Sequence, residues 1–186
     1  MKRTLIKAAL NRATGMDSIL VNGWVRTRRD SKGFSFLEIN DGSCLKNMQV
    51  IVDESAPVFH LLKDDGTGAA VEVAGALVES PGAGQKWEVK AAGLRLLGMA
   101  DPETFPLQKK RHTDEFLRTI AHLRPRTNNY GARFRIRSEA AFAVHHFFRD
   151  KGFFHLHTPI LTGSDCEGAG EMFRVSTLPL CPPAPP

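Results

Sequence analysis

Phe34-Ser-Phe-Leu-Glu-Ile39, followed at once by Asn40-Asp-Gly-Ser43, is the stretch that decides the fold predicted for this chain. Because successive side chains of a β-strand point to opposite sides, Leu37 and Ile39 fall on one face, and both Phe rings and Glu38 fall on the other. The Asn-Asp-Gly-Ser run that follows is a strong turn signal. The stretch therefore predicts a strand with one face in a core and one aromatic face outside it.

Further strands are predicted on both sides of this one. Residues 19–26 alternate between apolar and other side chains, and the polar run from Arg28 to Gly33 predicts a turn before Phe34. A short helix is expected at 56–63, ended by the Gly-containing run 64–68. Five strands with a helix between the third and the fourth follow the order of an OB-fold, although another small β-barrel or a sandwich has a similar pattern. The remaining strands are expected at 48–52, 70–78 and 86–97.

The second half of the chain is predicted to be mainly helical. Pro102 and Pro106 mark a boundary, after which a helix capped by Thr113 extends to about Leu123 and is stopped by Pro125. From Phe134 the apolar residues recur with a helical period and form a wide face, which is normally buried on more than one side. We expect Gly152 to end this helix, 153–158 to form a short strand and Pro159 to close it.

Composition sets limits on the class of protein. The chain has 186 residues, a formal net charge of +5 and 42% hydrophobic residues, which is ordinary for a soluble protein and weakly favours a polyanionic partner. The three cysteines have no paired spacing, so neither a disulfide framework nor a thiolate zinc site is predicted. No signal peptide or membrane span is recognised, and a cytoplasmic location without membrane contact is expected.

Two surfaces are candidates for binding nucleic acid. Phe36, with Gln49 on the neighbouring strand and Arg28 and Arg29 in the preceding turn, suits single-stranded nucleic acid. The ring stacks on a base, the amide reads a base edge, and a guanidinium holds phosphate or stacks. The alternative is that one Phe belongs to the core and the arginines form a solvated turn. Lys, Arg and His are also frequent in 107–127, which is either a solvated linker or a phosphate-binding segment.

Two C-terminal features are weaker candidates. His155 and His157 share the face of a predicted strand near Cys166, but packed histidines are the commoner case and no metal site is predicted. The Gly-rich acidic loop at 164–171 brings backbone close to a ligand and carries carboxylates that suit a substrate ammonium group, although by itself it has the composition of a surface loop.

Taken together, these segments resemble the asparaginyl-tRNA synthetases, a family of class II aminoacyl-tRNA synthetases. The similarity extends over nearly all of residues 1–178 in the order of that family. The stretches that carry it are Trp24-Val-Arg-Thr-Arg-Arg-Asp30, Phe36-Leu-Glu-Ile-Asn-Asp-Gly-Ser43, Gln49-Val50, Phe105-Pro-Leu-Gln-Lys-Lys-Arg-His112, Glu115-Phe-Leu-Arg-Thr-Ile-Ala-His-Leu-Arg-Pro-Arg-Thr127, Thr158-Pro-Ile-Leu161 and Glu167-Gly-Ala-Gly-Glu-Met-Phe173.

The resemblance implies an α+β chain in four parts. An OB-fold at 1–102 would bind the anticodon, a helical hinge would occupy 103–131, the opening of a class II catalytic domain would occupy 132–178, and an aberrant Pro-rich tail would follow at 179–186. The family activates asparagine with ATP and Mg²⁺ and transfers it to tRNA(Asn). The aspartyl enzymes share this plan, but their loop typically continues from Glu-Gly-Ala into Arg-Asp, whereas Gly170-Glu171 follows here.

Residue roles follow from the same resemblance. Phe36 would stack on an anticodon base of tRNA(Asn), Gln49 would read one, and Arg29 would support both. Glu167 would bind the α-ammonium group of asparagine within a mobile loop. Motif 1, from the long helix to the strand that ends at Pro159, would form a homodimer interface. The other residues implied are Ser164, Gly168 and Ala169 in the loop, and Gly152 and Phe153 in motif 1.

The sequence departs from the family toward its C-terminus. Neither the ATP-binding Arg of motif 2 nor the Gly-rich motif 3 is found, the Mg²⁺-binding carboxylates are absent, and no Arg follows Arg174. The segment Leu178-Pro-Leu-Cys-Pro-Pro-Ala-Pro-Pro186 has the composition expected of a shifted reading frame or a shortened gene. We therefore predict that this polypeptide alone binds no ATP or Mg²⁺, makes no adenylate, and leaves the apolar face of its long helix uncovered.

Overall fold

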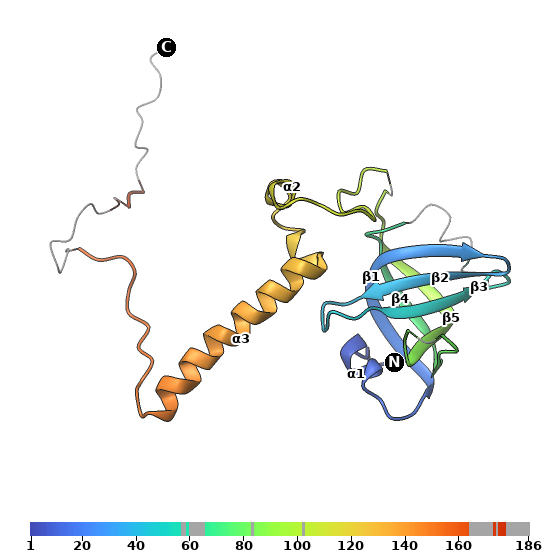
Figure 1. Ribbon diagram of the computed structural model, residues 1–186, viewed down its shortest axis with the longest axis horizontal. Helices are drawn as coiled ribbons and strands as arrows, with labels where there is room; N and C mark the ends of the chain where they lie inside the picture. The colour runs from blue at the N-terminus through green and yellow to red at the C-terminus, as the bar shows by residue number, and fades with distance from the viewer. Residues whose placement is uncertain are drawn as a thin grey trace, which may run out of the picture. The chain divides into compact units, whose positions relative to one another are not determined.

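The computed structural model describes residues 1–56, 59, 66–82, 84–101, 103–163, 173 and 175–177 (Figure 1). The chain divides into two compact units, Met1–Ser138 and Glu139–Pro186. The first unit holds a β-barrel, a linker at 103–127 and the beginning of a long helix. The second holds the remainder of that helix and the chain that follows it.

Five strands form a closed barrel in the order β1-β2-β3-β5-β4 (Figure 1). The β3–β5 pair is parallel and the other four pairs are antiparallel. Closure leaves no unpaired sheet edge, and it gives each strand one face inside the barrel and one outside. The predicted five-stranded OB-fold is therefore confirmed. The strands are β1 (Met16–Ser31), β2 (Phe34–Asn40), β3 (Met48–Asp53), β4 (Ala70–Glu79) and β5 (Trp87–Gly98).

The turn predicted at 28–33 is wrong in its extent. β1 continues to Ser31, and its polar residues pair with β2 in register, so that only Lys32 and Gly33 form the turn. Gly33 has a φ of 89°, which favours glycine. The polar run stays in the ladder because Asp30 binds both Arg28, at 2.9 Å, and the buried hydroxyl of Ser35. The helix predicted at 56–63 lies mostly outside the described residues.

The barrel core is aliphatic, and a short helix closes one end of it. Helix α1 (Ile6–Leu10) buries Ile6 and Ala9 completely against the core. Its N-cap residue Leu5 has no capping side chain, so the caps come from the loop after β2. Asp41 accepts a hydrogen bond from the backbone N–H of Ile6 at 3.0 Å. The largest fully buried side chains of the core are Trp87, Ile6, Ile19, Leu37, Ile39, Met48 and Leu77.

The linker carries one short helix and a small core of its own. Helix α2 (Asp114–Thr119) has the predicted cap, since the Thr113 side chain accepts a hydrogen bond from the Phe116 N–H at 3.2 Å. It ends earlier than predicted, and Pro125 lies in a separate 3₁₀ turn, η2 (Arg124–Arg126). Leu107, Leu117 and Tyr130 form the buried cluster beneath them.

Helix α3 (Asn128–Asp150) begins six residues before the predicted start at Phe134. Its end is as predicted, because Gly152 has a φ of 84° and donates its N–H to the Arg149 carbonyl at 2.9 Å. The Phe153 N–H reaches the Phe148 carbonyl at 3.1 Å, which completes a Schellman cap.

The strand predicted at 153–158 is not formed in the described part of the chain. A strand is held by hydrogen bonds to a neighbour, and within the second unit these residues have no such neighbour among those described. Several large apolar side chains are exposed there, as expected for an uncovered face. They include Phe142, Val144, Phe147, Phe153, Phe154, Leu156 and Ile160.

We predict that Asp41→Ala lowers the free energy of unfolding by about 1–2 kcal/mol, the usual cost of losing a helix cap. Asp41 is nearly inaccessible, at 1% side-chain exposure, and binds Ser43, Ile6 and Arg3. Urea denaturation measures the change. Asp53→Ala is the matched control, because Asp53 makes the same turn with Ser55 but, among the described residues, caps no helix. Equal losses in the two variants would contradict the capping role.

Asp41 also predicts a sensitivity to acid. Burial raises the pKa of Asp41, but the hydrogen bonds from Ser43, Ile6 and Arg3 outweigh it and hold the pKa below its ordinary value. A carboxyl whose pKa is lowered by folding stabilises the protein above the pKa of the unfolded chain, and this stabilisation is lost as the pH falls. The stability difference between wild type and Asp41→Asn is therefore expected to shrink below about pH 4. A difference that stays constant from neutral pH to pH 3 would exclude this origin.

Candidate nucleic-acid interface

The outer face of β2 presents an aromatic pair to solvent. Ser35, Leu37 and Ile39 are fully buried, whereas Phe34 and Phe36 on the other face are half-buried, as the alternation predicts. The two rings meet edge to face with centroids 5.0 Å apart. Neither ring belongs to the barrel core, so the alternative in which one Phe is a core residue is wrong.

Arg29 lies directly opposite Phe36 on β1, and its guanidinium carbon is 4.9 Å from the centroid of the Phe36 ring. The pairing comes from the part of β1 that was predicted to be a turn. A cation beside the ring face strengthens a stacking platform and places a positive charge where a backbone phosphate would follow a stacked base.

Gln49 lies on the outer face of β3, beside this platform. Its register partners are Glu38 on β2 and Glu88 on β5. Gln49 Nε2 donates to Glu88 Oε2 at 3.1 Å, and the Ser80 hydroxyl donates to the same oxygen at 2.8 Å. Glu88 is only 4% exposed. This carboxylate fixes the Gln49 amide with its N–H₂ toward the protein, which leaves the carbonyl oxygen to accept from a ligand.

Glu88 and Ser80 were missed by the sequence analysis. Glu88 is 39 residues from Gln49 along the chain, and only the parallel β3–β5 pairing brings the two together. No local pattern in the sequence predicts that contact.

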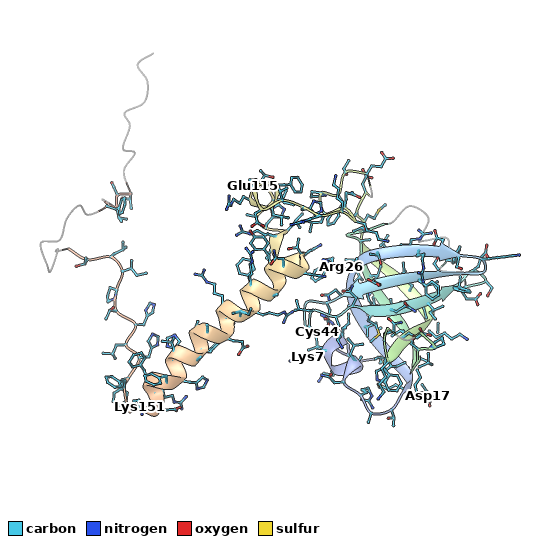
Figure 2. All side chains as sticks on the ribbon, viewed as in Figure 1. Lys7, Asp17, Arg26, Cys44, Glu115 and Lys151 are labelled. Atoms are coloured by element: carbon cyan, nitrogen blue, oxygen red, sulfur yellow. The ribbon has the colours of Figure 1, made fainter. Side chains whose placement is uncertain are left out.

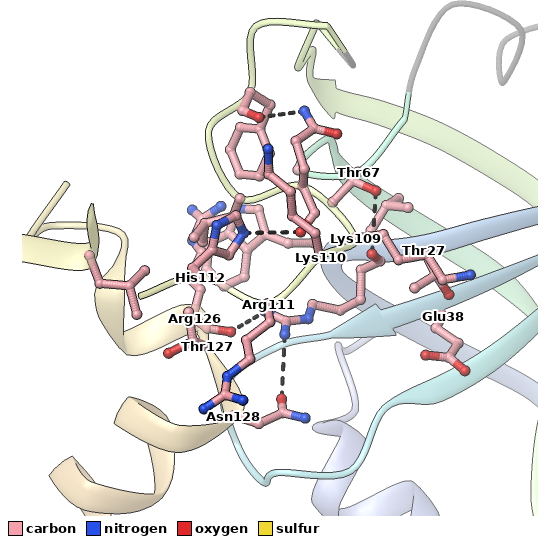
Figure 3. Close-up of a pocket in the computed structure, with 18 of the residues that line it drawn as sticks. Thr27, Glu38, Thr67, Lys109, Lys110, Arg111, His112, Arg126, Thr127 and Asn128 are labelled. Carbon is pink, nitrogen blue, oxygen red and sulfur yellow. Dashed lines mark hydrogen bonds between the residues drawn. The ribbon is translucent and has the colours of Figure 1, made fainter. Parts of the chain in front are cut away.

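A cavity of about 570 Å³ lies between the barrel and the linker (Figure 3). Thr27, Glu38 and Asn47 line it on the barrel side, and residues 109–112 line it on the linker side. Apolar residues of the linker, Phe105, Leu107 and Leu117, also contribute to its wall.

The basic residues around this cavity divide into two groups. Arg26 donates to the Arg126 carbonyl, and to Asn128 Oδ1 at 3.4 Å, which ties β1 to the start of α3. Arg126 lies over the Trp24 ring, with its guanidinium carbon 4.4 Å from the centroid. Burial lowers the pKa of both guanidinium groups, and for Arg26 the nearby Glu38 opposes the effect.

Lys109, Lys110 and Arg111 form the second group. They are exposed, and within the described residues none of them makes an ion pair with a carboxylate. Figure 2 shows the linker densely covered with long side chains. Among the described residues that line the cavity, this second group is the better placed to bind a polyanion, because Arg26 is hydrogen-bonded to the linker and Arg126 packs on the Trp24 ring.

The other candidate residues are not brought into this interface. Ser164, Glu167, Gly168 and Ala169 lie outside the described residues. Gly152 caps α3, Phe153 is 64% exposed, and Pro159 is exposed in the chain that follows. His155 packs against His145 with ring centroids 4.6 Å apart.

Neither a metal-binding group nor a membrane span is found among the residues described. No three His, Cys, Asp or Glu side chains gather there in a way that would hold a metal ion. None of the helices described is long and apolar enough to span a membrane.

Two family models match the chain. OB-fold nucleic acid binding domains match residues 19–97, and class II tRNA synthetases (D, K and N) match residues 113–180. The asparagine–tRNA ligase of Oleidesulfovibrio alaskensis is 70% identical over 179 residues, which are 96% of this chain and 39% of that protein. The asparagine–tRNA ligase of Nitratidesulfovibrio vulgaris is 68% identical over 97% of this chain and 39% of its own length.

Solved structures share the fold. An asparaginyl-tRNA synthetase from Pyrococcus horikoshii superimposes with a TM-score of 0.76 at 20% identity, covering 87% of this chain and 38% of that one. An aspartyl-tRNA synthetase from Entamoeba histolytica gives a TM-score of 0.68 at 18% identity, covering 87% and 40%. The chain spans about 39% of the length of the curated relatives named above. The resemblance to asparaginyl-tRNA synthetases indicated by the sequence is confirmed.

We predict that Arg26→Gln loosens the linker, because the Arg126 carbonyl and the Asn128 amide oxygen lose their guanidinium donors. The Arg126 carbonyl is partly buried and Asn128 is exposed, so the expected loss is about 0.5–1.5 kcal/mol, the net contribution of one hydrogen bond. Chymotrypsin should cut the linker faster, at Leu107 or Phe116, while cleavage within the barrel is unchanged. Arg28→Gln is the control on the same strand, since Arg28 binds Asp30 and not the linker. Equal cleavage rates in both variants would exclude the tie.

Proposed function

We propose that this chain, a homologue of the asparagine–tRNA ligases, is the part of such a ligase that binds the anticodon of tRNA(Asn). The observation that carries the proposal is the outer face of β1–β3. There a half-buried ring, a guanidinium 4.9 Å from its centroid and an amide fixed by a buried carboxylate lie on neighbouring strands. A closed barrel that presents these three groups together suits an unstacked base better than a folded protein partner.

Each of the three residues has one role in this proposal. Phe36 stacks on one anticodon base, and Arg29 supports the ring and the phosphate beside it. Gln49 offers its carbonyl oxygen, because its N–H₂ is held by Glu88. That oxygen accepts from a base edge carrying an N–H, such as the imino group of uracil, the middle base of a GUU anticodon. Glu88 and Ser80 are positioning residues, which act through Gln49.

The activity of the whole ligase is part of the same proposal. In it, residues 1–102 are the anticodon-binding domain, 103–131 the hinge and 132–178 the beginning of the catalytic domain, where Glu167 takes the ammonium group of asparagine. The complete enzyme would activate asparagine with ATP and Mg²⁺ and transfer it to tRNA(Asn) in the cytoplasm. The 186-residue polypeptide by itself carries no residues for motifs 2 and 3, and we assign it tRNA binding alone.

Association through motif 1 is the proposed oligomeric mode. The C-terminal part of α3 and the chain after it expose Phe142, Phe147 and Leu156 at 58–77% of their surface. Apolar faces of this kind promote association, and a second copy would bury them. Gly152, Phe153 and Pro159 would lie at that interface.

Removing the Phe36 ring tests the anticodon assignment. Phe36→Ala should weaken binding of a GUU anticodon stem–loop RNA by roughly 1–3 kcal/mol, the value of one stacked base. Fluorescence anisotropy at fixed salt measures the affinity. Phe142→Ala removes an exposed aromatic ring from the second unit and should leave this affinity unchanged. Unchanged affinity in Phe36→Ala would exclude the anticodon assignment.

Base preference separates this proposal from generic single-strand binding. Wild type should favour the GUU stem–loop over one with a changed middle base, and Gln49→Ala should remove most of that preference. A protein that binds both RNAs equally before mutation would be a generic single-strand binder. The aspartate-type alternative would instead favour a GUC stem–loop over GUU.

A separate assay tests whether the chain catalyses adenylate formation. The purified 186-residue chain, mixed with asparagine, ATP and Mg²⁺, is expected to give no ATP–pyrophosphate exchange above background. A full-length asparagine–tRNA ligase serves as the positive control. Exchange above background from this chain alone would show that its sequence holds adenylate-forming residues that we did not recognise.

A further inference from the structure

We propose that the cavity between the barrel and the linker binds one more nucleotide of the bound RNA, with Lys109–Arg111 on its phosphate and Glu38 on an amino group of its base. The inference rests on the proposed function, because it extends the path of the RNA beyond Phe36 and Gln49. At about 570 Å³, the cavity falls in the range of small-ligand sites.

The cavity is continuous with the proposed base-reading face. Glu38 lies two residues after Phe36 on the same side of β2 and directly opposite Gln49 on β3. It also lines the cavity, with Thr27 opposite it on β1 (Figure 3). Two residues along a strand span about 7 Å, so Glu38 meets a neighbour of the stacked base and not the same base.

The Glu38 carboxylate is built to accept one further hydrogen bond. Asn47 Nδ2 donates to Glu38 Oε2 at 2.9 Å, and Asn47 Oδ1 accepts from Asn40 Nδ2 at 3.1 Å, which fixes the Asn47 amide. Across the described residues, Glu38 Oε1 has no protein donor. An oriented carboxylate with a free oxygen selects a ligand that carries a donor.

The charges of the cavity orient the nucleotide within it. The Glu38 carboxylate repels phosphate, and the Arg26 guanidinium near it is already bound to the Arg126 carbonyl and to Asn128, so this end of the cavity suits the base. The linker side carries Lys109, Lys110 and Arg111, which have no carboxylate partner in the described part of the chain and attract the phosphate. The apolar wall formed by Phe105 and Leu107 suits the base and the sugar between them.

This arrangement predicts which bases are accepted. Adenine, cytosine and guanine each carry an exocyclic amino group that can donate to Glu38 Oε1. Uracil has only its imino N–H, which lies between two carbonyl oxygens that a carboxylate repels. The site is therefore expected to reject uridine at one position of the anticodon loop, next to the bases read by Phe36 and Gln49.

The test uses the full 186-residue chain and GUU anticodon stem–loop RNAs in which one loop nucleotide at a time is changed to uridine. At the position held in the cavity, uridine should weaken wild-type binding on the order of tenfold, the value of one base-edge contact to a carboxylate. Glu38→Gln keeps an oxygen for Asn47 and presents an N–H₂ in place of the free oxygen. It should lose the discrimination at that position alone.

The linker side is tested by replacing Lys109, Lys110 and Arg111 with Ala. Affinity for every RNA should fall together, and the slope of log affinity against log salt should flatten by roughly 0.7 for each lost phosphate contact. The control replaces Lys2, Lys7 and Arg12, which removes the same charge away from the cavity. Equal effects of the two triple variants would show that Lys109, Lys110 and Arg111 act only through the net charge of the chain. That result would overturn this half of the proposal.

A photo-reactive p-benzoylphenylalanine at Lys109 gives a readout that does not depend on affinity. It should crosslink to the loop position at which Glu38→Gln lost discrimination. The proposal is overturned by the following result. Wild type binds the GUU stem–loop with anticodon preference, but Glu38→Gln alters the discrimination against uridine at no loop position, and the crosslink falls outside the loop. Failure of anticodon preference itself would overturn the proposed function instead. Competition by free AMP as effective as by the stem–loop would identify a mononucleotide site and also contradict the inference.

Discussion

The parallel pairing of β3 with β5 is the constraint on which the rest of the first unit depends. It closes the barrel, and it fixes the register in which Val50 meets Val89 inside and Gln49 meets Glu88 outside. Without that pair, β3 would be an edge strand with unpaired backbone groups. The Gln49 amide would then lack the buried carboxylate that orients it. The same alternation sends Leu37 into the core and Phe36 out of it, so the stability of the barrel and the geometry of the face have one origin.

The basic residues of the first unit differ in what they bind, because some contact the protein and others are exposed. Three guanidinium groups contact the protein itself. Arg26 donates to a backbone carbonyl, Arg124 lies over the Tyr130 ring, and Arg126 lies over the Trp24 ring. The contacts of Arg26 and Arg126 hold the linker on the barrel beside the cavity that Glu38 lines, whereas the Arg124 contact joins the end of the linker to α3. Lys109, Lys110 and Arg111 are left to act on a ligand. The net charge of +5 therefore says little by itself about where an anion binds.

Sequence reasoning recovered the strands and the two faces of β2 because alternation is a local property of the chain. It failed where the outcome depends on residues far apart. The polar run at 28–31 was assigned to a turn, although Asp30 holds it in the ladder through Ser35. Helix α1 was not predicted, because its cap is Asp41, 35 residues away. The strand at 153–158 was predicted from its pattern, but a pattern supplies no neighbouring strand. Glu88 was missed for the same reason. The basic segment 107–127 was recognised as a possible phosphate-binding segment, but the cavity that it forms with Glu38 was not predicted.

In the proposed function, one outer face of the barrel, on β1–β3, binds the anticodon. Backbone amide chemical shifts, recorded by NMR while the chain is titrated with the GUU stem–loop, locate the surface that meets the RNA. The large changes are expected at 27–30, 34–38, 47–51 and 109–112, and small changes on α1 and β4. Changes centred on α1 or β4, or none at RNA concentrations that saturate binding, would contradict this assignment.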